Sequence, residues 1–201
     1  AGSANTALGY KSGMPMRYGV RNTILGTVAM GACAVGTLAT PLTGNIAIGH
    51  HAYRQGASHY AIAIGCSAME NANDDFSDII AIGQYAMMED SAAYNIGIGY
   101  QAGKLTKNGG KNVFLGYNAG ANGVASEKNV YIGYLSGRDV LGVGINVALG
   151  SGAMQGGSGA TANTDVAIGQ NALNNVTTGS RSVFIGNNAG ANGVVNVTTG
   201  N

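Results

Sequence analysis

The sequence predicts an all-β chain that folds as a parallel β-solenoid of about eleven coils, each of about 17 residues. Three observations predict this fold. The phrase NVFLGYNAG (112–120) recurs as NIGIGYQAG (95–103), NVYIGYLSG (129–137) and SVFIGNNAG (182–190). Charged residues make up only 9% of the chain, against about a quarter in ordinary domains, yet 45% of residues are hydrophobic. Glycine accounts for 35 of the 201 residues, which suits tight turns between short strands.

Each repeat is anchored on a glycine that follows Ile or Leu. The anchors lie 16 to 23 residues apart: Gly9, Gly26, Gly49, Gly65, Gly83, Gly99, Gly116, Gly133, Gly150, Gly169 and Gly186. No break in this series suggests a second domain, so we expect one repeat domain over residues 5–201, after residues 1–4 that look like a cloning scar. Units that cannot bury an apolar face alone form a rod by stacking.

The three residues before each anchor predict a short strand. The residue before the anchor is always Ile or Leu, and the residue two places earlier is always β-branched, as in Leu115 and Val113. Side chains two apart on a strand share a face, so we expect this pair to form the buried stripe. The residue between them, such as Phe114 or Tyr131, should then face a roomier setting.

Two further columns describe the turns. Three places after the anchor only Ala or Ser occurs, as at Ala119, which indicates a crowded position that excludes larger side chains. Four places before the anchor Asn recurs, as at Asn112, with Asp165 in one copy. Asn bonds nearby backbone and tolerates the left-handed region, so we expect a turn and a coil-to-coil ladder there.

The return segments vary, with insertions at 30–44 and 69–78. The second insertion carries the densest acidic group: Asn73, Asp74, Asp75 and Asp78. These side chains lack the spacing of an EF-hand loop, so a solvated loop is expected and a calcium site is the alternative.

The phrases NIAIGHHA (45–52), AIAIGCSA (61–68), IIAIGQYA (79–86) and DVAIGQNA (165–172) resemble the YadA-like head repeat of trimeric adhesins, which is also similar to segments of bacteriophage tail fibres. The resemblance implies a left-handed parallel β-roll, three chains around one axis, and a role in attachment. The location it implies is extracellular, on a virion tail fibre or a bacterial surface.

A homotrimer is also expected on physical grounds. One aliphatic stripe and one Ala column make a thin core, and a second apolar column would leave a hydrophobic strip exposed on a monomer. We expect that column to run through Phe114, Tyr131 and Phe184. Exposed strips of this kind usually mark an interface.

The leading hypothesis is therefore a non-enzymatic fibre segment that binds a cell-surface glycan or an outer-membrane receptor. A pure spacer is an alternative. Two enzyme classes also stay open. IGYQAG (98–103) and IGNNAG (185–190) fit the hexapeptide pattern of β-helix acyltransferases. A glycan-degrading enzyme would need a pair of carboxylates, for which the candidates are Glu70, Glu89, Asp90 and Asp139.

The candidate ligand-binding residues are tyrosines directly after an anchor: Tyr10, Tyr100, Tyr117 and Tyr134. The last three fall on successive coils, so stacking should place them in a ladder about 5 Å apart. Aromatic faces beside Asn amides suit sugars, and the alternative is that the rings only pack.

Metal and cofactor chemistry is not expected. His50, His51 and His59 are expected in a solvated loop or turn, and adjacent histidines on a strand would point apart, which makes a poor joint metal site. Cys33 and Cys66 fit no zinc or redox spacing. The net charge of +1 gives no electrostatic case for nucleic acid, and the chain has no run of 18 apolar residues for membrane insertion.

Overall fold

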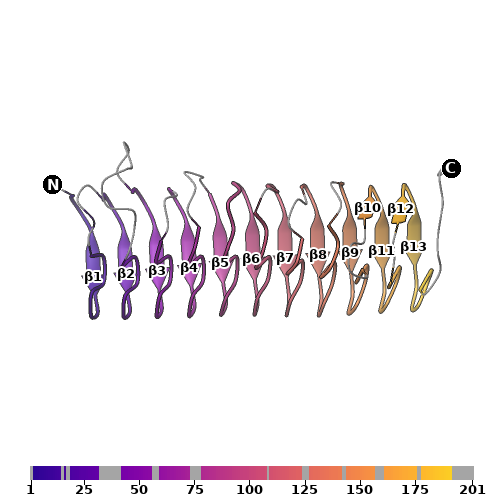
Figure 1. The fold of residues 1–201 in the computed structure, drawn as a ribbon, viewed down its shortest axis with the longest axis horizontal. Helices are drawn as coiled ribbons and strands as arrows, with labels where there is room; N and C mark the ends of the chain where they lie inside the picture. Colours follow the sequence, from indigo (N-terminus) through magenta and orange to yellow (C-terminus); the bar gives the residue numbers. More distant parts are fainter. Residues whose placement is uncertain are drawn as a thin grey trace.

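A computed structural model describes residues 2–14, 16, 19–31, 42–55, 59–72, 78–107, 109–123, 127–141, 144–156, 161–175 and 178–191. These residues form a rod in which parallel strands follow one another in sequence order, with β1 and β13 at opposite ends (Figure 1). Much of the two insertions, with Cys33, Asn73, Asp74 and Asp75, lies outside the described residues.

Every repeat contributes one three-residue strand to a single parallel sheet. Its eleven strands are β1 (Thr6–Leu8), β2 (Thr23–Leu25), β3 (Ile46–Ile48), β4 (Ile62–Ile64), β5 (Ile80–Ile82), β6 (Ile96–Ile98), β7 (Val113–Leu115), β8 (Val130–Ile132), β9 (Val147–Leu149), β11 (Val166–Ile168) and β13 (Val183–Ile185). A second sheet pairs β10 (Thr161–Asn163) with β12 (Thr178–Ser180), also in parallel. The predicted all-β solenoid is confirmed.

The anchor glycines are required by the backbone. Their φ angles lie between 125° and 137°, a region that side chains other than hydrogen rarely allow. A Cβ on any anchor from Gly9 to Gly169 would also lie 2.4–2.6 Å from the carbonyl oxygen of the next anchor. At Gly186, the last anchor, the nearest atom would be 3.9 Å away. The glycine column is thus the line along which successive coils approach most closely.

The predicted asparagine ladder is present. The Oδ1 atom of Asn95 accepts the backbone N–H of Asn112 at 2.9 Å, and Asn112 Oδ1 accepts that of Asn129 at 2.8 Å. The ladder continues through Asn146 and Asp165 at 2.8–2.9 Å. These side chains are buried, so each rung supplies a partner to a backbone group that would otherwise be costly to bury.

The expected direction of the strand side chains is wrong. The middle residue of the strand faces the solenoid interior: Phe114 and Tyr131 are fully buried, as are Ala47 and Ala81. The flanking Ile, Val and Leu side chains lie half-exposed or exposed on the outer face. The narrow coil accepts only one inward residue per three-residue strand, so the pair that shares a face is the outer one.

The interior is filled by an exchange of volume between two positions of the repeat. From β3 onward, where the middle strand residue is Ala, the residue four places after the anchor is large, as with Ala81 and Met87. Where it is aromatic, that partner is glycine: a Cβ on Gly120 would lie 2.4 Å from the Phe114 ring. The pair Tyr131 and Gly137 follows the same rule. Coils of these two kinds therefore reach close packing with a different residue in the same space.

The predicted Ala column is confirmed as a crowded interior position. Three places after the anchor, the described side chains from Ala29 to Ala172 are buried, and Ser136 takes the same place in β8's repeat. Ser136 Oγ donates to the carbonyl of Ala148 at 3.0 Å, which satisfies its hydroxyl inside the coil. The core is therefore one continuous column along the rod, and it contains the aromatic residues that the sequence suggested for an outer strip.

Candidate functional site

The tyrosine ladder forms as predicted on three successive coils. The ring centroids of Tyr100 and Tyr117 are 5.0 Å apart with planes inclined by 15°, and those of Tyr117 and Tyr134 are 5.3 Å apart with planes inclined by 19°. Tyr117 and Tyr134 are exposed. Tyr10 does not join them. It sits in the first repeat with 67% of its surface exposed, and Lys11 Nζ lies 5.2 Å from its ring centroid.

The spacing decides what the ladder can present. Two coplanar phenol rings side by side would interpenetrate at 5.0 Å, so the rings overlap as offset stacks. Each ring therefore covers part of its neighbour's face, and the ladder offers ring edges, hydroxyls and partial faces to a ligand. The ring faces that stack between coils are the same faces that a sugar would need, so the ladder's two uses compete for one surface.

Sequence reasoning missed a fourth ring at the end of the ladder. Tyr85 packs edge-on against Tyr100, with centroids 6.1 Å apart and planes inclined by 79°. Tyr85 lies two places after its anchor instead of one, and its φ of 58° turns it toward the next coil. This position of the repeat takes left-handed backbone in many copies, which the residue types do not reveal.

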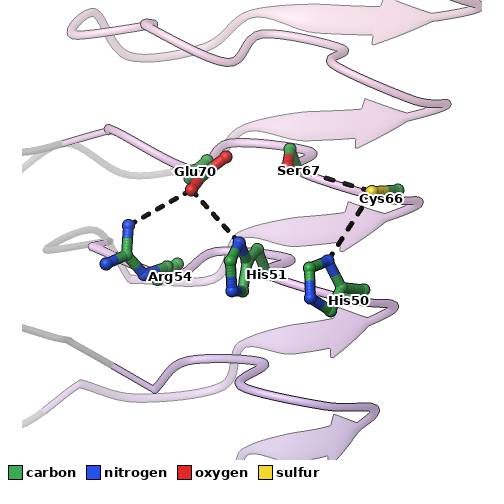
Figure 2. A network of polar contacts seen from close by, with 6 residues as sticks. All are labelled: His50, His51, Arg54, Cys66, Ser67 and Glu70. Atoms are coloured by element: carbon green, nitrogen blue, oxygen red, sulfur yellow. Dashed lines mark hydrogen bonds and ion pairs between the residues drawn. The ribbon is translucent and has the colours of Figure 1, made fainter.

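A polar cluster interrupts the tyrosine column at the third and fourth repeats (Figure 2). Cys66 Sγ lies 3.9 Å from His50 Nδ1 and 3.9 Å from Ser67 Oγ. On its flank Glu70 Oε1 lies 3.4 Å from His51 Nδ1 and 3.2 Å from Arg54. These contacts join neighbouring coils, because each pair except Cys66 with Ser67 spans 16 to 19 residues.

His50 and His51 lie in a turn, as expected, and their side chains do not point apart. Their rings stack with centroids 3.9 Å apart, because His51 lies in a turn at a φ of 55° and not on a strand. Burial lowers the pKa of His51, and the neighbouring His50 lowers it further, while Glu70 acts in the opposite direction. Among the described residues no group of three or more His, Cys, Asp or Glu side chains is arranged to hold a metal ion.

The four candidate carboxylates have separate environments. Glu70 pairs with Arg54, Glu89 with Lys107 at 2.7 Å, and Asp139 with Arg138 at 2.6 Å. Asp90 is buried instead, and accepts from the Asn95 amide at 3.2 Å.

Burial raises the pKa of Asp90 well above its usual value, against the opposing effect of hydrogen bonds from Asn95 and from the backbone N–H groups of Ala92 and Ser91. Asn95 Nδ2 also donates to the carbonyls of Ala92 and Gly109 at 3.1 and 2.9 Å. Asp90 therefore belongs to the hydrogen bonding of the asparagine ladder, at the point where the ladder resumes after Ala61 and Ile79 replace Asn.

Comparisons with known proteins identify no relative. No family model, no curated protein and no solved structure matches this chain. In the described part of the chain no helix has the length and apolar character that crossing a membrane requires.

Proposed function

We propose that this chain is a non-enzymatic segment of a homotrimeric fibre, a left-handed β-roll that attaches to a cell surface. A bacteriophage tail fibre is the first assignment, and the head of a bacterial trimeric adhesin is the second. In both, the segment lies outside the cell and meets a surface glycan or an outer-membrane receptor.

The observation that carries the proposal is the outer face of the eleven-stranded sheet. Two columns of aliphatic side chains cross it, one on each side of the buried middle residue, with Thr only at Thr6 and Thr23. With strands about 4.8 Å apart, this strip is roughly 50 Å long. A continuous apolar strip of this size calls for cover by another protein surface.

Three copies around an axis parallel to the rod would cover all three strips at once. Because the strand register is constant from β1 to β13, every coil would meet the equivalent coil of its neighbours. The interface expected from the sequence, through Phe114 and Tyr131, is excluded by their burial, and the aliphatic face replaces it.

Two features favour a fibre over the enzyme alternatives. Each repeat contributes one three-residue strand to the large sheet, whereas the hexapeptide pattern needs three flat sides in every coil. The candidate carboxylates Glu70, Glu89 and Asp139 are paired with cations on separate coils.

A charge placed in the strip tests the trimer. Ile80 is half-exposed at the centre of the face on β5, and Gln84, just beyond the same strand, is exposed. Ile80→Glu would bury unpaired carboxylates between three chains, so sedimentation velocity should show it as a monomer. Gln84→Glu carries the same charge change outside the strip and should sediment like the unaltered protein. A trimer that survives Ile80→Glu would remove the aliphatic face from the proposal.

Attachment is tested with the whole chain. The fluorescently labelled protein should bind saturably to bacterial cells, and mild periodate treatment of the cells, which cleaves sugar diols, should reduce the binding. Binding that resists periodate but not protease would indicate a protein receptor. A trimer that binds no cell type in a broad panel would be a spacer.

A further inference from the structure

An open depression lies on the side of the rod where the return segments enter the strands. It is lined by Ser91–Tyr94 ahead of β6, Gly110 and Lys111 ahead of β7, and Glu127 ahead of β8. Three consecutive repeats thus contribute to it. Its volume of about 370 Å³ falls at the lower end of the range of roughly 300–1,000 Å³ that small-ligand sites occupy.

The floor of the depression is fixed by backbone hydrogen bonds between coils. The Lys111 N–H donates to the carbonyl of Ala93 at 3.2 Å, and the Lys128 N–H donates to that of Gly110 at 3.0 Å. A Cβ on Gly110 would lie 2.7 Å from the Ala93 oxygen, so the glycine permits this close approach. A floor of bonded backbone is formed before a ligand arrives, which lowers the cost of ordering on binding.

The walls combine one aromatic ring with two ionic groups. Tyr94 and Lys111 occupy equivalent positions of successive repeats, each with a φ of 65°, and both are exposed. Within the described residues the Tyr94 ring contacts no other ring, unlike the stacked Tyr117 and Tyr134. No neighbouring ring in this part of the chain therefore covers its faces, as rings do in the ladder.

The charged groups of the depression keep their hydrogen-bonding capacity. Lys111 and Glu127 have no ion pair among the described residues, whereas Glu70, Glu89 and Asp139 are all paired. One ammonium and one carboxylate supply donors and acceptors together and sum to no net charge. This combination suits a neutral ligand with several hydroxyls, since a net charge on the ligand would face one like charge.

We propose that this depression binds one neutral hexopyranose unit of a glycan. The apolar C–H face of the sugar stacks on the Tyr94 ring, and its hydroxyls donate to Glu127 and accept from Lys111. Because the depression is open, the rest of a glycan chain extends into solvent. The inference deepens the attachment function proposed above and rests on it only for the choice of a glycan as ligand.

Saturation-transfer NMR of the whole protein with the methyl glycosides of glucose, galactose, mannose and N-acetylglucosamine tests the site. At least one glycoside should receive saturation at its C–H protons. Tyr94→Ala should weaken its binding about tenfold or more, and Glu127→Gln should weaken it as well, because both remove ligand contacts. Tyr60→Ala is the matched control, since Tyr60 lies at the same place of an earlier repeat and 59% of it is exposed against 55% of Tyr94, and it should bind like the unaltered protein.

Circular dichroism of each variant checks that the solenoid is intact. Absence of transfer to all four glycosides would overturn the proposal, and so would a signal that is kept in Tyr94→Ala but lost in a separate ladder variant, Tyr134→Ala, which would place the sugar on the ladder. The oligomer is measured on the same samples by sedimentation. A monomer that binds the glycoside would support this site and overturn the trimeric fibre. A trimer that binds none of the four glycosides would overturn this site and support the trimer.

Discussion

The volume exchange inside the solenoid predicts that two damaging substitutions compensate each other. Phe114→Ala removes a fully buried ring, and truncations of this kind cost about 3–5 kcal/mol of unfolding free energy. Gly120→Met places a side chain against that ring, where even a Cβ would lie 2.4 Å from two ring carbons. Overpacking of this kind costs about 1–3 kcal/mol.

The double variant should recover most of the loss, because it recreates an arrangement that the chain already contains. Ala81 with Met87, and Ala148 with Met154, fill the same space in other coils. The two methionines hold φ angles of 47° and 50°, close to the 60° of Gly120. A volume-conserving exchange leaves a residual cost under about 1.5 kcal/mol. The single costs sum to at least about 4 kcal/mol, so the coupling should be about 2.5 kcal/mol or more.

The assay is urea unfolding of the four proteins at one fixed concentration, since stability depends on concentration in an oligomer. The matched control combines Phe114→Ala with Gly190→Met. A Cβ on Gly190 would lie 2.5 Å from the Phe184 ring, four repeats away from Phe114, so this pair should be additive. Additive losses for Phe114→Ala with Gly120→Met would refute the exchange of volume.

Three further predictions concern the turns and the ladder. Gly116→Ala and Gly186→Ala both place a side chain at a φ near 135°, but only at Gly116 would the new Cβ meet the next coil. The melting temperature of the protein should therefore fall further in Gly116→Ala than in Gly186→Ala, and equal shifts would refute the steric argument. Because the folded chain holds the pKa of Asp90 above its unfolded value, stability should fall as pH rises from below 3.8 through the raised pKa. Asp90→Asn should remove that pH dependence and raise the urea midpoint at pH 7, and a lower midpoint would contradict it. Asn112→Ala removes the acceptor of the Asn129 N–H and should cost about 1–3 kcal/mol in urea unfolding, whereas an unchanged midpoint would show that solvent replaces the rung.

The repeat made the course of the backbone predictable. The alternation of Val113 and Leu115 around a variable residue predicts a strand before each anchor. The recurring glycine at the anchor marks a backbone position that other side chains do not fit. The ladder of Tyr100, Tyr117 and Tyr134 follows from stacking alone, since residues at the same place of successive coils must be neighbours.

The inside of the solenoid was predicted wrongly because alternation does not say which face is buried. A strand of three residues presents two side chains to one face and one to the other, and both assignments satisfy the pattern. The sequence does hold a signal that decides between them. Phe114 occurs with Gly120 and Ala81 with Met87, and such reciprocal sizes at two positions indicate that both side chains enter one space.

The depression at Tyr94 lay beyond prediction for a different reason. It depends on the approach of Ala93 to Gly110 and on the entry of Glu127 from a third repeat, and these return segments differ in length and residue type. Position within the repeat therefore does not determine contact there. The stacking of His50 on His51 was missed for a related reason, since the left-handed backbone of His51 is not evident from its residue type.

The mass of the protein in solution tests the central claim most directly. Multi-angle light scattering over a hundredfold dilution should give a constant mass of three times the chain mass of 20.0 kDa, because only the proposed trimer would cover the aliphatic face of the eleven strands. A constant mass of a single chain would contradict the account, since the aliphatic strip would then remain exposed to water in a stable monomer.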